Sequence, residues 1–223
     1  MSVDLPLGPP LENLSQPAFG PPAAYPEPVT AGLAQDAACI IARYPHPRSA
    51  LLPLLHLVQS QDSCLTQAGI AFCAAQLDLT AAEVAAVASF YSMYRRQPTG
   101  EYLVGVCTNT LCAVMGGDAI LAALQNELGI TPGQTTADGC ITVEQIECNA
   151  ACDYAPVVMV NWEFFDNQTP CSAAELMEQL RSGQRVQPTR GSSSLCNFQQ
   201  TARTLAGLAP MVGNAGNERT RPC

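Results

Sequence analysis

Residues 104–117 read VGVCTNTLCAVMGG and hold two cysteines, Cys107 and Cys112, with four residues between them. The pair comes directly after residues 102–106, a short apolar run that is typical of a β-strand. Gly116 and Gly117 follow the pair and predict the opening of a helix that runs to about residue 128. The stretch therefore predicts a strand, a cysteine loop and a helix in that order.

A second cysteine pair repeats this arrangement further along the chain. Residues 144–161 read EQIECNAACDYAPVVMVN, in which three residues separate Cys148 from Cys152. This pair also follows a strand-like run, at 141–146. Two strand ends are able to deliver four thiolates to one point, so the two pairs together predict a single site.

Four thiolates suit either Zn(II) or an iron–sulfur cluster. Structural zinc sites most often use ligands two to four residues apart around one ion, in short CxxC turns. The longer and unequal separations found here favour a binuclear 2Fe–2S cluster, with zinc as the alternative. The chain contains no CxxC, which argues against a thioredoxin-like dithiol. Its two histidines precede Cys107 by about fifty residues or more, which argues against a Rieske centre.

Two strings carry a resemblance to a known family. Residues 90–112, FYSMYRRQPTGEYLVGVCTNTLC, and residues 147–161, ECNAACDYAPVVMVN, resemble the thioredoxin-like 2Fe–2S subunit of the NADH-oxidising module of respiratory complex I. Relatives of that subunit serve NAD-linked hydrogenases and formate dehydrogenases. The resemblance covers about residues 30–182. It implies that the four cluster ligands, which are also the expected metal ligands, are Cys107, Cys112, Cys148 and Cys152.

The resemblance also implies a fold and a function. The expected fold is α+β, with a small N-terminal helical bundle followed by a thioredoxin-like α/β domain that carries one 2Fe–2S cluster. The expected function is that of an electron-transfer subunit of NADH:quinone oxidoreductase. FMN and NADH would be bound only by a partner subunit, and other peripheral-arm subunits would be further partners. The complex would lie on the cytoplasmic side of the inner membrane.

Three alternatives remain open at this point. The chain could be the equivalent subunit of an NAD-linked hydrogenase or formate dehydrogenase. It could also be a free-standing thioredoxin-like ferredoxin, although a helical bundle before the cluster domain favours a subunit that makes contacts. The third alternative is a zinc-stabilised interaction domain with no redox role.

Composition excludes several other classes. The net charge is −9 and the sequence contains no lysine, so neither a nucleic-acid partner nor a lysine-dependent phosphate loop is expected. No GxGxxG or GxxxxGK[ST] motif is present, so no independent catalytic site is expected. No apolar run approaches the ~20 residues that span a bilayer, which predicts no direct membrane insertion. The N-terminal residues show neither a secretory nor a mitochondrial address, which favours either a bacterial cytoplasmic protein or a chain that is already processed.

The chain divides into four expected parts. Eight prolines in the first part predict an extended arm, and five arginines against one glutamate give the last part a net charge of +4. Both ends are expected to be mobile in the isolated chain, and the arginines of the last part are expected to contact an acidic face of the flavin-bearing partner. The parts are a proline-rich arm (1–29), a helical bundle (30–97), a thioredoxin-like 2Fe–2S domain (98–183) and a basic tail (184–223).

Several single residues carry further expectations. Phe90 and Tyr91 are expected to be buried between the bundle and the second domain, and His56 is expected to be a satisfied core residue. Asp153 is expected to be solvated, and Asn109 and Asn149 are expected either to donate to cluster sulfur or to shape turns. The other seven cysteines are expected to be reduced thiols without a chemical role: Cys39, Cys64, Cys73, Cys140, Cys171, Cys196 and Cys223.

Overall fold

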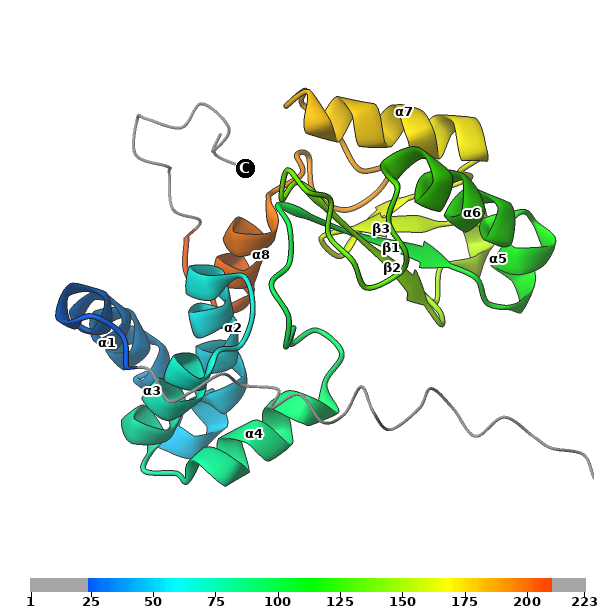
Figure 1. The fold of residues 1–223 in the computed structure, drawn as a ribbon. Coiled ribbons are helices and arrows are strands. Elements are labelled where there is room, and N and C mark those ends of the chain that lie inside the picture. The colour runs from blue at the N-terminus through cyan, green and yellow to red at the C-terminus, as the bar shows by residue number, and fades with distance from the viewer. Residues whose placement is uncertain (1–23, 210–223) are drawn as a thin grey trace, which may run out of the picture.

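The computed structural model describes residues 24–209, and it places a helical bundle beside a helix-covered sheet (Figure 1). The bundle contains α1 (Glu27–Ile41), the 3-10 turn η2 (Pro47–Ala50), α2 (Leu51–Asp62), α3 (Gln67–Leu77) and α4 (Ala81–Phe90). The elements around the sheet are β1 (Tyr102–Cys107), α5 (Thr110–Val114), α6 (Gly117–Leu128), β2 (Ile141–Ile146), the 3-10 turn η3 (Cys152–Tyr154), β3 (Val158–Val160), β4 (Glu163–Phe165) and α7 (Pro170–Arg181). The last helix is α8 (Phe198–Leu205). The predicted α+β fold is confirmed.

The start of each bundle helix reflects local sequence. Thr80 and Glu83 form a capping box at the start of α4, in which each side chain accepts the backbone N–H of the other residue. Thr66 caps α3 by accepting the N–H of Gly69. Ser49 lies within η2, and α2 begins without a side-chain cap from a described residue.

The bundle has its own hydrophobic core, built from aliphatic side chains of α1 to α4. Its fully buried members include Ile40, Leu54, Leu55, Leu57, Val58 and Leu65. Within residues 24–209, no single helix is long and apolar enough to cross a membrane. The pair α3 and α4 passes that test only by length and composition, and it is bent by 116°.

Two polar side chains are buried on α2. Gln59 accepts the N–H of Arg95 at 2.7 Å and donates to the carbonyl of Met93 at 3.1 Å, so it fastens the segment after α4 to the bundle. His56 stacks on Tyr94 with ring centroids 4.8 Å apart, and burial lowers the pKa of His56 to about 4. His56 is buried as expected, but its Nδ1 has no hydrogen-bond partner among residues 24–209.

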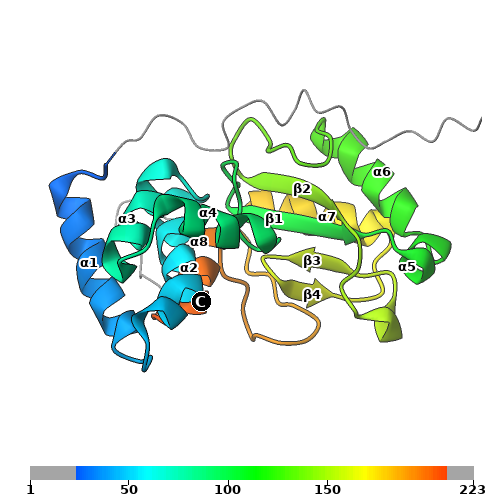
Figure 2. The same cartoon turned by 90° about the horizontal axis from the view of Figure 1, so that it is seen from below.

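The sheet has the strand order β2-β1-β3-β4. β1 runs parallel to β2 and antiparallel to β3, and β3 runs antiparallel to β4. Helices α6 and α7 lie on one face of the sheet (Figures 1 and 2). Together with the sheet they bury a second core, in which the strand members are Val104, Val106, Ile141, Val143, Val158, Val160 and Phe165. The main elements of this domain follow the order β-α-β-β-α, with the short helix α5 added after Asn109.

The prediction of a separate tail after residue 184 is wrong for its described portion, residues 184–209, called here the C-terminal segment. This segment returns to the bundle, where α8 lies against α2 (Figure 1). Phe198 is fully buried and stacks on Trp162 of the β3–β4 turn at a centroid distance of 5.4 Å. The C-terminal segment therefore joins the two halves of the chain. The remaining division into parts is still a prediction, and residues 1–23 and 210–223 lie outside the described residues.

Two arginines of this segment bind acids of the same chain. Arg203 pairs with Asp36 of α1 at 2.8 Å, and Arg190 pairs with Asp153 and Asp166 at 2.9 Å each. These contacts correct two expectations. The sequence predicted that these arginines contact an acidic partner surface, but both bind acids of their own chain. Asp153 is ion-paired as well as solvent-exposed.

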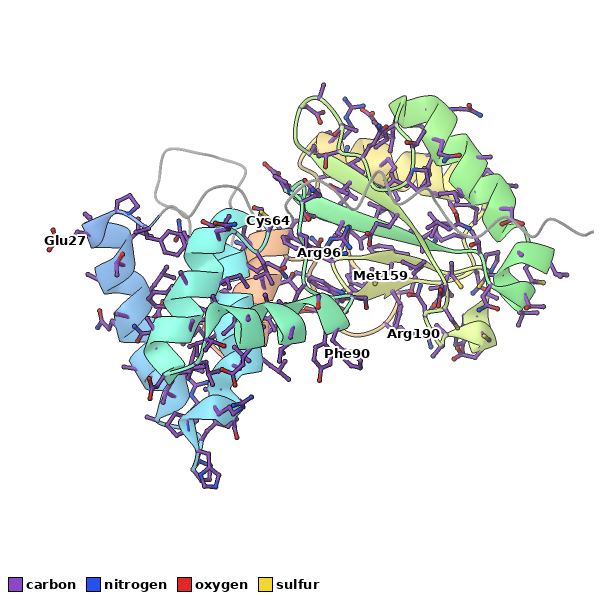
Figure 3. All side chains as sticks on the ribbon, turned by 60° about the horizontal axis from the view of Figure 1, so that its bottom comes forward. Glu27, Cys64, Phe90, Arg96, Met159 and Arg190 are labelled. Carbon is purple, nitrogen blue, oxygen red and sulfur yellow. The ribbon has the colours of Figure 1, made fainter. Side chains whose placement is uncertain are left out.

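The expected burial of the aromatic residues after α4 is also wrong. Phe90 is 80% exposed and Tyr91 is 44% exposed. Figure 3 shows Phe90 at the end of α4, on the side of the bundle that faces the sheet domain. The two rings border an open groove whose opposite wall includes Gly133 and Glu144. They lie at the junction as expected, but they are not buried between the bundle and the sheet domain.

The cysteines outside the two pairs differ in their surroundings. Cys64, Cys73 and Cys140 are buried, whereas Cys39 and Cys171 are exposed. Burial raises the pKa of Cys73 to about 12, so this thiol is protonated at neutral pH. Cys196 is disulfide-bonded, which corrects the expectation of a reduced thiol at that position. Cys223 lies outside the described residues.

Candidate metal centre

The parallel pairing of β1 and β2 brings the two cysteine loops to the same end of the sheet. In the register of these strands Cys107 is opposite Ile146, and the N–H of Thr108 donates to the carbonyl of Ile146 at 3.4 Å. Cys148 follows Ile146 by two residues. Because parallel strands end at a common edge, both cysteine loops leave the sheet at the same end.

The first pair is buried. Cys107 ends β1 and Cys112 lies in α5, and their exposed fractions are 2% and 3%. Asn109 caps α5 by accepting the N–H of Thr110 at 2.7 Å, which supports the turn role expected for its side chain. Both thiols pack with Ala155, and Ile146 covers them from β2. The short helix α5 thus places Cys112 beside Cys107.

The two glycines after this pair have separate roles. Gly116 has φ of 111°, a left-handed conformation that side chains rarely adopt. A Cβ at Gly117 would lie 2.5 Å from the carbonyl oxygen of Cys107 and 2.9 Å from that of Cys112. Only glycine therefore lets α6 begin directly against the backbone of both cysteines.

The second pair lies at the surface. Cys148 and Cys152 are exposed, and the N–H of Ala150 donates to the Cys148 sulfur at 3.2 Å. The Nδ2 of Asn149 is buried without a hydrogen-bond partner, which leaves a donor free in the cysteine loop. Sulfur ligands of iron–sulfur clusters accept hydrogen bonds from such groups. The loop therefore fits a sulfur-rich centre.

Burial, with a smaller contribution from the neighbouring Cys107, raises the pKa of the Cys112 thiol to about 11, while a backbone hydrogen bond at Val157 opposes the shift. A coordinated thiol loses its proton outright because the metal supplies positive charge. Among residues 24–209, no group of three or more His, Cys, Asp or Glu side chains is arranged to hold a single metal ion. A 2Fe–2S cluster takes two protein ligands on each iron, so the pairs are the relevant units.

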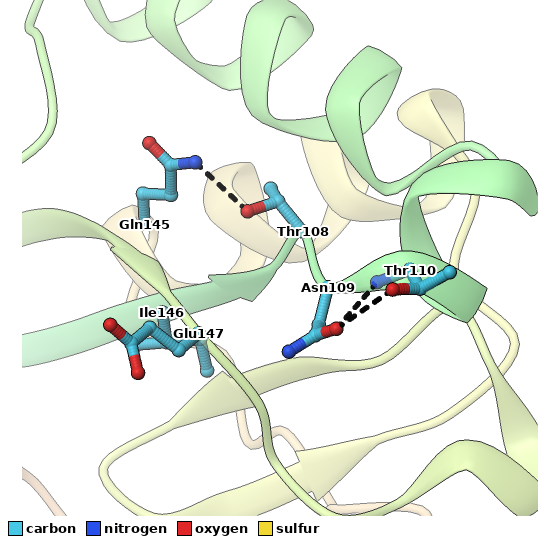
Figure 4. A pocket seen from close by; sticks show the side chains of 6 residues that line it. All are labelled: Thr108, Asn109, Thr110, Gln145, Ile146 and Glu147. Carbon is cyan, nitrogen blue, oxygen red and sulfur yellow. Dashed lines mark hydrogen bonds between the residues drawn. The ribbon is translucent and has the colours of Figure 1, made fainter. Parts of the chain in front are cut away.

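A polar hollow lies beside the first cysteine at the ends of β1 and β2 (Figure 4). It has a volume of about 660 Å³ and is lined by Thr108, Asn109, Thr110, Gln145, Ile146 and Glu147. The side chain of Gln145 donates to the Thr108 hydroxyl at 2.9 Å, which links the two strand ends. Because of this hollow, the sheet is open at the end that carries the cysteines.

The ion pair between Arg190 and Asp153 lies next to the second cysteine pair and was not expected from the sequence. The Arg190 guanidinium holds the pKa of the Asp153 carboxyl below its usual range. The two residues are 37 positions apart, so no local pattern relates them. A single arginine in the segment after α7 does not by itself predict this contact.

Comparison with known proteins shows the same kind of domain. Residues 37–181 match the family described as thioredoxin-like [2Fe-2S] ferredoxin. The chain belongs to this family. The thioredoxin-like [2Fe-2S] ferredoxin match includes both cysteine pairs and ends before the C-terminal segment.

Relatives with assigned names extend the comparison. The chain is 66% identical over 203 residues to an NADH-quinone oxidoreductase subunit of Mycobacterium tuberculosis, and the match covers 91% of this chain and 80% of the relative. It is 37% identical over 149 residues to an NADH-quinone oxidoreductase subunit of Thermus thermophilus, covering 66% and 82%. Both matches cover most of the relative's own length.

A solved structure shares the fold. The crystal structure of an NAD+-reducing [NiFe]-hydrogenase aligns with a TM-score of 0.54 and 26% identity. The alignment covers 59% of this chain but only 23% of that chain. The fold of this chain is therefore similar to one part of a larger chain.

Proposed function

We propose that this chain is the electron-transfer subunit of an NADH:quinone oxidoreductase and holds one 2Fe–2S cluster. The ligands are the buried pair Cys107 and Cys112 and the exposed pair Cys148 and Cys152. The observation that carries the proposal is the parallel pairing of β1 with β2, which ends both strands beside the cysteine loops. When bound, such a cluster accepts and releases one electron.

The protein supplies position and surroundings to this chemistry. The buried first pair excludes water from one side of the site, and the exposed second pair leaves the other side open to a partner. The Ala150 N–H and the free Asn149 Nδ2 are donors suited to sulfur ligands, and such bonds raise the tendency to accept an electron. The chain therefore sets the place and potential of the electron carrier.

The substrate side of the reaction belongs to a partner subunit in this proposal. The chain has no nucleotide-binding loop in its sequence, so FMN and NADH are bound by the partner and other peripheral-arm subunits complete the assembly. Exposed apolar side chains surround the cysteine end of the domain, where a partner would cover them: Leu111, Val114, Met115 and Tyr154. In this proposal the assembly lies on the cytoplasmic side of the inner membrane.

A second candidate is the equivalent subunit of an NAD-linked hydrogenase. The structural similarity to an NAD+-reducing [NiFe]-hydrogenase favours it at 26% identity. The relatives named as NADH-quinone oxidoreductase subunits match at 66% and 37% identity over more of this chain. The greater identity and coverage favour the oxidoreductase.

The test of partner dependence uses the purified chain with its cluster and a flavin-bearing partner subunit. Alone, the chain is expected to be reduced by dithionite but not by NADH, because it lacks a nicotinamide site. Adding the partner should allow NADH to bleach the visible absorption of the cluster. NADH oxidation by the chain alone with an artificial electron acceptor would contradict the proposal.

A further inference from the structure

Arg190 lies in the C-terminal segment, beyond residues 37–181 that match the family. A backbone bridge pairs it with Phe164 of β4, and the N–H of Thr189 donates to the carbonyl of Phe164 at 2.9 Å. The segment thus runs along the open edge of the sheet before it continues to α8. Figure 3 shows Arg190 beside the sheet, on the side of the second cysteine turn.

The guanidinium of Arg190 contacts two of the three residues of η3 (Cys152–Tyr154). Its terminal nitrogens donate to both carboxylate oxygens of Asp153, at 2.9 and 3.3 Å. Its Cζ lies 5.3 Å from the ring centroid of Tyr154, within cation–π range. Arg190 therefore binds the turn that begins with Cys152, one of the proposed cluster ligands.

The opposite side of Arg190 is anchored on β4 and the residue after it. It donates to Asp166 at 2.9 Å, and its Cζ lies 5.1 Å from the ring centroid of Phe164. The Asp166 side chain is only 8% exposed, so this anchor is held rigidly. Arg190 consequently connects an exposed cysteine turn to an ordered part of the sheet.

Besides Arg190, the N–H of Asn167 holds the turn by donating to the Tyr154 carbonyl at 2.9 Å. The backbone bonds within it are long, from Tyr154 N–H to the Ala151 carbonyl at 3.3 Å and from Ala155 N–H to the Cys152 carbonyl at 3.4 Å. A bidentate, charge-assisted pair is stronger than such bonds and fixes orientation as well. Without Arg190, Asp153 would also place an uncompensated negative charge next to Cys152.

We propose that Arg190 is a positioning residue for the cluster, holding the Cys152 turn in place and offsetting the charge of Asp153. This inference rests on the proposed function, because it requires a cluster at the two cysteine pairs. Arg190 is therefore expected to have two separate effects on the cluster. Orientation of the turn governs how firmly the cluster is retained, and the positive charge favours the reduced cluster, which carries one more negative charge.

The experiment compares Arg190→Gln with Arg185→Gln in the full chain carrying its cluster. Arg185 is exposed on the same segment and forms no ion pair with a described residue, so it controls for loss of one positive charge. Loss of cluster absorbance to an iron chelator should be about tenfold faster in Arg190→Gln, since charge-assisted bonds are lost. The midpoint potential should fall in Arg190→Gln and remain near the wild-type value in Arg185→Gln.

Arg190→Lys separates the two consequences and serves if Arg190→Gln does not fold. Lysine keeps the positive charge but lacks the planar guanidinium that binds a carboxylate through two N–H groups. We therefore expect a midpoint potential near that of the wild type with faster cluster loss. Wild-type rate and potential in folded Arg190→Gln would overturn the inference, as would both values remaining unchanged in Arg190→Lys when the glutamine variant is unfolded. A wild-type chain that holds no iron and sulfide would instead contradict the proposed function.

Discussion

Replacing Cys107 or Cys148 with alanine is expected to abolish retention of the cluster. Each substitution removes one of the four thiolates, and an iron left with a single protein ligand is open to water and chelators. One residue comes from the buried pair and one from the exposed pair, so the test covers both loops. Iron content and visible absorbance of anaerobically purified variants are the measurements, and both should be close to zero.

Matched controls come from exposed cysteines outside the two pairs. Cys39→Ser and Cys171→Ser alter exposed thiols and should leave the iron content unchanged. Alanine is preferred at the ligand positions because the oxygen of serine is able to replace a thiolate. Full iron content in Cys148→Ala would show that another group completes the site and that the ligand assignment is wrong.

The second large effect is expected from Phe198→Ala. The side chain is fully buried between α2 and the β3–β4 turn, where it stacks on Trp162. Truncating a buried phenylalanine leaves a cavity and lowers the free energy of unfolding by about 3–5 kcal/mol. Urea denaturation followed by circular dichroism measures this loss.

Leu205→Ala on the same helix is the control for that substitution. Leu205 is 40% exposed, so we expect its truncation to change the free energy of unfolding by about 0.5 kcal/mol or less. An effect of Phe198→Ala no larger than that of the control would show that α8 does not contribute to the bundle core. The C-terminal segment would then be a separate tail after all.

Local patterns are sufficient to predict much of the cysteine domain. The apolar runs before each cysteine pair form β1 and β2 at the predicted positions, and the glycines after Cys112 begin α6. The Thr80 capping box depends on residues three positions apart, so it too is readable from the sequence. These features are predictable because the residues that determine them are neighbours in sequence.

Long-range contacts explain the failures. The sequence of α8, FQQTARTL, has few apolar residues, and Phe198 is buried because α2 and Trp162, both distant in sequence, lie against it. Arg190 binds Asp153 and Asp166, which lie 37 and 24 positions away in the sequence, and no local sequence pattern predicts such contacts. Burial is the natural expectation for Phe90 because aromatic stretches are usually core, but a groove separates it from the sheet domain. Each error concerns how distant segments meet.

Analysis of iron, zinc and acid-labile sulfide in the anaerobically purified wild-type chain decides whether its four paired cysteines carry a 2Fe–2S cluster. We expect two irons and two sulfides per chain, as the cluster formula requires, in a coloured protein. One zinc per chain without sulfide, in a colourless protein, would instead show that the cysteines hold a structural metal ion and carry no electrons.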